Sequence, residues 1–370
     1  MCYDFYMKFI CDGEELAEAV ATVSRASNAR AINPILEGIK ITAKDGAVTL
    51  AATDLEMYVQ KTIRADIQIA GTAVVPGKLF SEYIGRLGAH PVTVSMEGET
   101  MRVVHGENVL AFQCLLLVEY PDIINISKKP HFSIKSDDLR DFITKARVSA
   151  SGDDSRPILK GILCEVGKDT MTGVALDGFR LSKVEKPVKN HADEIKVVVP
   201  VRSFDEIKKL IADDNGEVSV ILDKKFFQIN IGKVVFAGRL IDGEFINYNQ
   251  IIPTKFESNV VVERAGFDKA VDRAGLLGRS DKINLVTLGI TDKLVSITSN
   301  NEIGQIAEKV AAKLTGKDIK IAFNAKYLSD VLKATAAEFV KISFNGELGP
   351  CIIEPAKAAD HLFLVLPVRI

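Results

Sequence analysis

Apolar residues recur with the same helical spacing at three places along the chain. In each place they stand at positions i, i+3, i+4 and i+7, which lie on one face of an α-helix. The three sets are Leu16, Ala19, Val20 and Val23, then Leu139, Phe142, Ile143 and Ala146, and finally Phe267, Ala270, Val271 and Ala274. The pattern predicts three amphipathic helices with acidic residues near their starts, where the helix dipole favours negative charge.

A sequence pattern that predicts a strand followed by a helix, which we call a corner, also occurs three times. The corners read "VVPGKLFSEYIGRL", "VVPVRSFDEIKKLI" and "AFNAKYLSDVLKAT". Pro76, Pro200 and Asn324 stand at matching places and are separated by equal intervals. Each corner predicts a strand that runs into a second helix, so every copy contains two helices.

Alternating apolar and polar residues fill the stretches between these helices. Examples are "VTVSMEGETMRVV" and "VSVILDKKFFQINIGKVVFAG". Alternation bounded by turn residues is typical of antiparallel hairpins. The predicted fold class is therefore α+β, with two helices and about eight antiparallel strands in each copy and the helices on one face.

Further phrases keep the same register through the chain. "NPILEGIKI" returns as "RPILKGILC", and Asp54 in "ATDLEM" aligns with Asp177 in "ALDGFRL" and Asn301 in "SNNEIG". The repeat of about 123 residues is long enough for a domain. We predict three domains, 7–127, 128–254 and 255–370, joined at the short segments "SKKPHF" and "IIPTKFESN". Met7 is a possible natural start, which would make residues 1–6 an extension.

Composition narrows the class of protein. The chain has 370 residues, 47% of them hydrophobic and 26% charged, which is typical of a globular protein with more than one domain. No apolar run reaches the roughly 20 residues that cross a bilayer, and the N-terminus has no signal-peptide pattern. The five cysteines are scattered without a C-x-x-C pair, so we expect reduced thiols in the cytoplasm.

Motifs for catalysis, metals and cofactors are missing from the sequence. There is no P-loop, no G-x-S-x-G and no G-x-G-x-x-G. The histidines are expected to be solvated surface groups; they are His90, His105, His131, His191 and His361. We predict no catalytic residue, no metal site and no cofactor.

One carboxylate pair could suggest an active site. Asp54 and Glu56 are two positions apart, but Phe179 and Ile303 replace Glu56 in the other copies. This loss favours the interpretation that Asp54 stabilises a turn after a strand.

Basic residues occupy repeated helix positions although the net charge is only −2. Lys78, Arg202 and Lys326 share one place in the three corners, and Lys145 and Arg273 share another in the first helices. They are either solvated surface cations or parts of one positive surface that faces a polyanion. The residues alone leave both interpretations open.

The phrases "RPILKG", "ALDGFRL", "LIDGEF" before "IIP" and the terminal "LVLPVRI", together with the threefold repeat, resemble the bacterial β sliding clamp family from Met7 to Ile370. The resemblance implies a processivity subunit without chemistry of its own. Two subunits would join head to tail into a closed ring around duplex DNA. The implied partners are the DNA polymerase III alpha subunit, the clamp loader and other proteins with a clamp-binding motif, with no membrane involved.

The resemblance also implies DNA-binding residues. Matching or preferred positions are Arg30, Lys78 and Arg156, and Arg202 is added because it shares the repeated corner position of Lys78. Two places depart from the family: Leu79 stands beside Lys78 where a basic residue is found, and Asp153 stands where a polar contact is found.

The family's pocket for partner peptides lies between the second and third domains. Its matching positions are Leu159, Gly178, Phe179, Arg180, Leu181, Ile246, Gln250, Ile251, Asn324, Tyr327, Leu348, Val365, Leu366, Pro367, Val368 and Arg369. Ile246 replaces a frequent proline and Gln250 a frequent arginine, so we expect a pocket that is more apolar and less cationic.

For the dimer interface, the resemblance places Leu110 and Phe112 of one subunit against Leu276 and Leu277 of the other. Two alternatives to a ring are an enzyme assembled on the repeats, such as a hydrolase using Asp54, and a monomeric interaction module.

Overall fold

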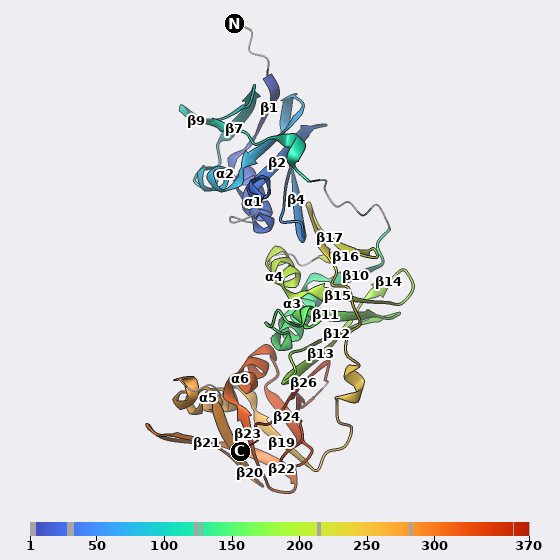
Figure 1. Ribbon diagram of the computed structural model, residues 1–370, viewed down its shortest axis with the longest axis vertical. Coiled ribbons are helices and arrows are strands. Elements are labelled where there is room, and N and C mark those ends of the chain that lie inside the picture. The colour runs from blue at the N-terminus through green and yellow to red at the C-terminus, as the bar shows by residue number, and fades with distance from the viewer. Residues whose placement is uncertain are drawn as a thin grey trace. The chain divides into compact units, whose positions relative to one another are not determined.

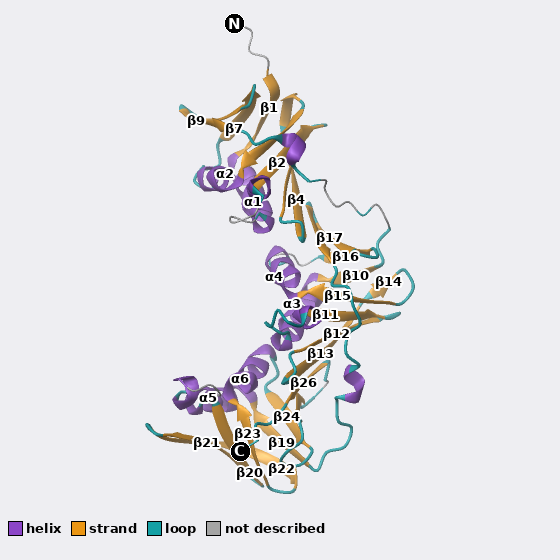
Figure 2. Ribbon diagram, viewed as in Figure 1, coloured by secondary structure: helices purple, strands orange, loops and turns teal. Residues whose placement is uncertain are grey.

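The computed structural model describes residues 5–27, 33–121, 126, 129–212, 216–280, 284–357 and 359–369. The chain divides into two compact units, Met1–Ser136 with Glu206–Leu240, and Asp137–Asp205 with Ile241–Ile370 (Figure 1). Six α-helices lie in the described residues, as the repeat predicts, and the strand pairings there are antiparallel (Figure 2).

The first unit contains α1 (Gly13–Val23) and α2 (Gly77–Ile84). A five-stranded sheet runs in the order β5-β1-β7-β8-β9; its strands are β1 (Phe5–Asp12), β5 (Asp66–Ile69), β7 (Pro91–Glu97), β8 (Thr100–His105) and β9 (Asn108–Gln113). Eight further strands of this unit are hydrogen-bonded in the order β10-β16-β17-β18-β4-β3-β2-β6, with β2 (Gly38–Lys44), β3 (Ala47–Thr53), β4 (Met57–Arg64), β6 (Gly71–Pro76), β10 (Phe132–Lys135), β16 (Glu217–Leu222), β17 (Phe226–Ile231) and β18 (Val234–Arg239).

The second unit contains α3 (Ser136–Ala146), the start of α4 (Val201–Leu210), α5 (Arg264–Ala274) and α6 (Ala325–Ala334). Its twelve-stranded sheet runs β15-β11-β12-β13-β26-β25-β24-β19-β22-β21-β20-β23. The strands are β11 (Gly161–Val166), β12 (Thr170–Leu176), β13 (Arg180–Pro187), β15 (Ile195–Pro200), β19 (Ser258–Glu263), β20 (Leu285–Thr291), β21 (Leu294–Asn301), β22 (Gly304–Gly316), β23 (Ile319–Asn324), β24 (Phe339–Phe344), β25 (Cys351–Pro355) and β26 (His361–Val365). The short β14 (Lys189–Asn190) also falls within the residues of this unit but is not a strand of this sheet.

The three apolar stripes that the spacing predicts are buried. α1 packs on β3 and β4, and α5 packs on β21, β22 and α6. Side chains that precede the helices satisfy free backbone N–H groups at their starts: Asp12 accepts from Glu14 N and Glu15 N at 2.9 Å each. Asn324 does the same for α6 by accepting from Lys326 N at 2.9 Å. No helix in the described residues combines the length and apolar character needed to span a membrane.

The repeat is visible as a repeated hydrogen bond that closes each corner. Leu115 N donates to Val74 O at 2.8 Å, and Ile241 N donates to Val198 O at 2.9 Å. In the third copy Val368 N donates to Ala322 O at 2.8 Å. In every copy the segment after the last strand therefore returns to the strand that leads into the second helix.

Asp54, Asp177 and Asn301 form one repeated turn. The Oδ1 atom of each accepts from two backbone N–H groups two and three residues further on, at 3.1 and 2.7 Å for Asp54, 2.9 and 3.0 Å for Asp177, and 2.9 and 3.2 Å for Asn301. The interpretation of Asp54 as a turn-stabilising residue is confirmed, and its paired-carboxylate alternative has no geometric support.

Leu55 adopts a strained backbone conformation in the first of these turns. Its φ is 75°, and Gly178 stands at the equivalent place with a φ of 94°. A left-handed conformation costs an L-residue roughly 1–2 kcal/mol, whereas glycine adopts it freely. We expect Leu55→Gly to raise the free energy of unfolding by up to about 1 kcal/mol and Gly178→Ala to lower it by about 1–2 kcal/mol. Urea unfolding measures both, and Leu79→Gly in α2 is the control because it should be destabilising; a loss of stability in Leu55→Gly would contradict the prediction.

Two strand pairings join successive repeats. β4 of the first repeat pairs with β18 of the second, with Met57 opposite Gly238. β13 of the second repeat pairs with β26 of the third, with Arg180 opposite Val365. We call each such pairing a seam. Because the seams join repeats, a compact unit is not the same thing as a repeat.

The third repeat has the corresponding strand without a seam. The residues of β22 up to Ala311 pair with β21 on one side, and β22 pairs with β19 only from Ala312 onward. Within the described chain nothing pairs with the other edge of 304–311. β9, which corresponds to β18 and β26, is an edge strand that pairs with β8. In the described chain β9 and residues 304–311 of β22 therefore each present an open edge.

Candidate functional site

Arg180, the first residue of β13, organises the predicted pocket. Its Nε donates to Asp177 Oδ2 at 2.9 Å, and one terminal nitrogen donates to Asp330 Oδ2 of α6 at 2.8 Å. The guanidinium also lies over the ring of Tyr327, 4.5 Å from its centroid. Charge-assisted hydrogen bonds and a cation–π contact thus fix this side chain between the second and third repeats.

An exposed aromatic side chain lies beside this arginine. The Phe179 ring stacks on Tyr327 with 6.1 Å between centroids, yet 59% of Phe179 is exposed. Phe179 N donates to Asp177 Oδ1 in the repeated turn. Further exposed apolar members of the predicted set are Ile246, Ile251, Leu348 and Leu366. A contiguous patch of exposed apolar residues is typical of a binding surface.

Other members of the predicted set are buried. Leu159 and Leu181 belong to a core cluster with Leu176, Phe245 and Tyr248. Leu159 lies in a short 3-10 helix, Pro157–Lys160, which comes directly before β11. Tyr248 Oη donates to Glu165 Oε2 at 2.7 Å, and burial together with this carboxylate raises the pKa of Tyr248.

The C-terminal segment forms another side. β26 ends at Val365, and Leu366 N still donates to Phe179 O at 2.8 Å. Pro367 has no N–H to donate, so the chain leaves the sheet there, as its sequence predicts. Val368 is partly buried, whereas Gly178, Gln250 and Arg369 are exposed and Asn324 caps α6.

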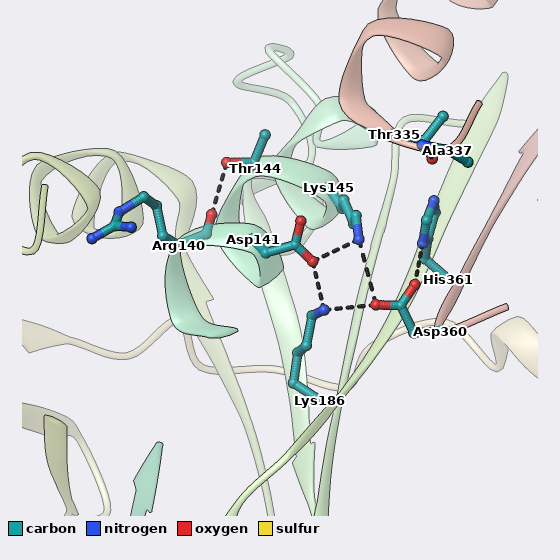
Figure 3. A network of polar contacts seen from close by, with 9 residues as sticks. All are labelled: Arg140, Asp141, Thr144, Lys145, Lys186, Thr335, Ala337, Asp360 and His361. Carbon is teal, nitrogen blue, oxygen red and sulfur yellow. Dashed lines mark hydrogen bonds and ion pairs between the residues drawn. The ribbon is translucent and has the colours of Figure 1, made fainter. Parts of the chain in front are cut away.

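A network of buried charges lies farther along the same seam (Figure 3). Lys186 Nζ contacts Asp141 Oδ2 at 2.5 Å and Asp360 Oδ2 at 2.6 Å. Lys145 Nζ lies 2.6 Å from Asp141 Oδ2 and 3.4 Å from Asp360 Oδ2. His361 Nδ1 is 2.5 Å from Asp360 Oδ1. These groups tie α3 and β13 of the second repeat to the strand that carries the C-terminus.

The network corrects two sequence predictions. His361 is buried, not a solvated surface group, and Lys145 is buried in ion pairs, not available on an exposed basic face. Burial alone would raise the pKa of Asp360, but the hydrogen bonds from Lys186 and His361 hold it well below its usual range. Burial lowers the pKa of His361, so its imidazole is neutral in the folded protein near pH 7.

The predicted DNA-binding residues lie on separate elements. Lys78 and Arg202 are exposed in the first turns of α2 and α4, and Arg156 is exposed directly before Pro157–Lys160. Arg30 lies outside the described residues. Asp153 accepts from Ser155 N at 2.9 Å and from Ser155 Oγ at 2.6 Å, and these hydrogen bonds lower the pKa of the carboxyl. The carboxylate of Asp153, which departs from the family pattern, therefore stabilises its own loop.

The predicted dimer residues stand near the two open edges. Leu110 and Phe112 belong to β9 and are partly buried, and the Phe112 ring centroid is 6.2 Å from that of Phe80. Leu276 follows α5 and is 48% exposed. Leu277 is partly buried, and its carbonyl accepts from Asn301 Nδ2 at 2.9 Å.

Comparison with known proteins covers almost the whole chain. Residues 7–124, 133–247 and 249–369 match the N-terminal, central and C-terminal domains of the DNA polymerase III beta subunit. The beta sliding clamp of Halalkalibacterium halodurans is 28% identical over 380 residues, which is 98% of this chain and 100% of that protein. The clamp of Bacillus subtilis is 28% identical over 376 residues, with 98% and 100% covered.

Solved structures agree with the family. The Bacillus subtilis DNA polymerase sliding clamp has a TM-score of 0.96 at 28% identity and covers 99% of this chain and 100% of its own. A sliding clamp from Bartonella birtlesii bound to griselimycin has a TM-score of 0.92 at 26% identity, with 98% and 100% covered. The clamp relatives are processivity factors, not catalytic subunits. The chain belongs to the DNA polymerase III beta subunit family, the bacterial sliding clamps.

Proposed function

We propose that two copies of this chain close head to tail into a ring around duplex DNA in the cytoplasm and tether replication proteins to it. The observation that carries the proposal is the pair of open strand edges. Two seams are already filled within one chain, and the third repeat presents the same strand with its edge unpaired. β9 of a second copy has the complementary open edge, so head-to-tail pairing repeats a contact that the fold makes twice.

The internal seams give the expected register of this junction. In them the residue that opens the seam strand lies opposite Gly238 or Val365, close to the end of the incoming strand. The same arrangement sets Gly304 of one copy opposite Phe112 of the other, with Ile306 opposite Leu110. Leu276, a predicted dimer residue, is exposed in the same repeat as Gly304 and Ile306.

Encirclement makes strong attraction to DNA unnecessary. The net charge of −2 gives the protein no overall affinity for a polyanion. A ring that holds DNA by topology needs only a few phosphate contacts, and contacts to phosphate alone allow sliding. Arg30, Lys78, Arg156 and Arg202 are the proposed contacts.

The surface around Arg180 is the proposed docking site for partner peptides. It offers exposed apolar side chains and few fixed polar groups, the combination that suits one apolar peptide anchored by some hydrogen bonds. The partners proposed are the DNA polymerase III alpha subunit, the clamp loader and other proteins with a clamp-binding motif. With Ile246 in place of a frequent proline and Gln250 in place of a frequent arginine, the proposed site is more apolar and less cationic than is usual in the family.

Native mass tests the ring. The wild-type protein should have about twice the mass of the 40.3 kDa chain. The double variant Leu276→Ala, Leu277→Ala should be a folded monomer, since each buried leucine that is lost costs roughly 2–5 kcal/mol. Leu348→Ala, another exposed leucine, is the control and should remain dimeric. A double variant that stays dimeric at low micromolar concentration would exclude this junction.

A DNA-binding measurement tests encirclement. Wild-type protein assembled on nicked circular DNA by a clamp loader should resist high salt and dissociate when the DNA is linearised. Replacing Lys78, Arg156 and Arg202 by alanine should flatten the salt dependence of nonspecific binding by about one unit of slope for each lost phosphate contact. An unchanged slope would show that these residues do not contact DNA, and salt-labile binding to circles would contradict encirclement.

A further inference from the structure

The residue directly before each seam strand has a fixed structural place. Lys233 precedes β18, and its carbonyl accepts from Thr62 N of the neighbouring repeat at 3.3 Å. Asp360 precedes β26, and its carbonyl accepts from Glu185 N at 2.8 Å. Thr62 and Glu185 are equivalent positions of β4 and β13. Glu107 precedes β9 and is therefore the third member of this set, at the edge that is open in the single chain.

In the first seam this residue is a cation in a cavity of mixed charge. Lys233 lines it together with Glu15 and Glu18 of α1 and with the cations Arg25, Lys61 and Lys209. Glu18 and Lys61 form an ion pair at 2.6 Å within that cavity. The charged residues that α1 itself contributes to the cavity are carboxylates, opposite in sign to Lys233.

In the second seam the signs are reversed but the rule is the same. Asp360 is an anion, and it lies 3.4 Å from Lys145 of α3 and 2.6 Å from Lys186 of β13. Asp141 neutralises the remaining positive charge, since it contacts both lysines. The receiving repeat again supplies charges of the opposite sign to the incoming residue.

At the open edge the receiving helix is α5. Alignment of the apolar stripes puts Lys269 and Arg273 of α5 at the positions of Asp141 and Lys145 in α3. Arg273 forms a bidentate pair with Glu308 of β22, at 2.9 and 2.7 Å. Lys269 is exposed and forms no ion pair with a described residue. Lys269 and Arg273 are therefore the positive groups that α5 offers to an incoming strand, with the charge of Arg273 already balanced by Glu308.

We propose that Glu107 of one copy pairs with Lys269 and Arg273 of the other and fixes which edges of two clamps can join. The proposal rests on the head-to-tail ring proposed above and assigns the charges that select its junction. Glu107 is exposed, and the described residues contain no ion-pair partner for it. Charge complementarity of this kind controls specificity and rate of association more than the final affinity.

Charge exchange tests the pairing. The dissociation constant of the dimer is measured by analytical ultracentrifugation at about 50 mM and about 500 mM salt, because salt screens exposed pairs. Glu107→Lys and Lys269→Glu should each raise the dissociation constant about tenfold at low salt, since a closed ring contains two junctions. The double exchange should recover most of the loss, and all differences should shrink at high salt. Asp66→Lys, on the opposite edge strand of the same sheet as β9, is the matched control and should have no effect.

The outcomes separate this proposal from the ring itself. A wild-type dimer whose dissociation constant is unchanged by both single exchanges would overturn the charge pairing and leave the ring intact. Single exchanges that weaken the dimer without recovery in the double variant would also overturn the pairing. A monomeric wild-type protein would instead contradict the ring. Thermal unfolding of each variant shows whether it is folded, and Glu107→Gln, which only removes the charge, should give a smaller effect than Glu107→Lys.

Discussion

Lys186→Met is expected to lower the free energy of unfolding by about 3 kcal/mol. The methionine fills the space of the lysine stem but removes the charge that lies between Asp141 and Asp360. Removing one partner of a buried ion pair typically costs about 3–5 kcal/mol, because the other charge loses its compensation. The lower end applies here, since Lys145 still contacts both carboxylates and the side chains of Asp141 and Asp360 are 37% and 39% exposed. Urea unfolding measures the loss, and hydrogen exchange should locate it in β13 and β26.

A matched lysine and a double variant make this experiment decisive. Lys168→Met removes an exposed lysine from the turn before β12 and should change stability by less than about 0.5 kcal/mol. Asp360→Asn combined with Lys186→Met should be less destabilising than the sum of the single changes, because both partners are neutralised together. Additive effects would mean that these two groups do not interact in solution.

Deleting residues 366–370 is expected to abolish binding of clamp-binding peptides while the dimer persists. The deletion removes exposed Leu366, the hydrogen bond from Leu366 N to Phe179 O and that from Val368 N to Ala322 O. β26 itself ends at Val365 and keeps its pairing with β13. Fluorescence anisotropy with a labelled peptide should show at least a hundredfold loss of affinity, roughly what losing one or two central contacts of an interface causes.

The repeat supplies the control for this second experiment. Phe179→Ala should weaken peptide binding, whereas Ile303→Ala changes the same position of the third repeat, where the side chain is 81% exposed, and should leave peptide affinity unchanged. Retained affinity in the truncated protein would disprove the assignment of the pocket. Loss of the dimer would mean that the C-terminal segment is needed for the fold.

Local patterns in the sequence were sufficient to predict the repeated elements. Helical stripes, strand-to-helix corners and the Asp54 turn depend on residues a few positions apart, so spacing and turn chemistry reveal them. The buried network could not be found in this way. Lys186 and Asp360 are far apart along the chain, and hydropathy assigns both to solvent, because it does not register a partner that arrives from another strand.

The pocket shows the same limit. Nothing local distinguishes Tyr327 from any other aromatic residue on a helix, and only the resemblance singled it out. The structure explains the position of Tyr327. Arg180 donates hydrogen bonds both to Asp177 in its own turn and to Asp330 on α6, and this places its guanidinium over the Tyr327 ring. Such a contact depends on how β13 packs against the third repeat. The hydrophobic periodicity of the sequence does not predict this packing.

The open edge of β22 also affects the tendency of a newly synthesised chain to aggregate. Until it finds a second copy, each subunit carries the open edges of β9 and of residues 304–311 in β22, and open edges are templates for aggregation. Lys309 of β22 is exposed, and charged side chains on an edge oppose stacking with identical edges. This charge would therefore protect the lone subunit from fibre-like association during synthesis.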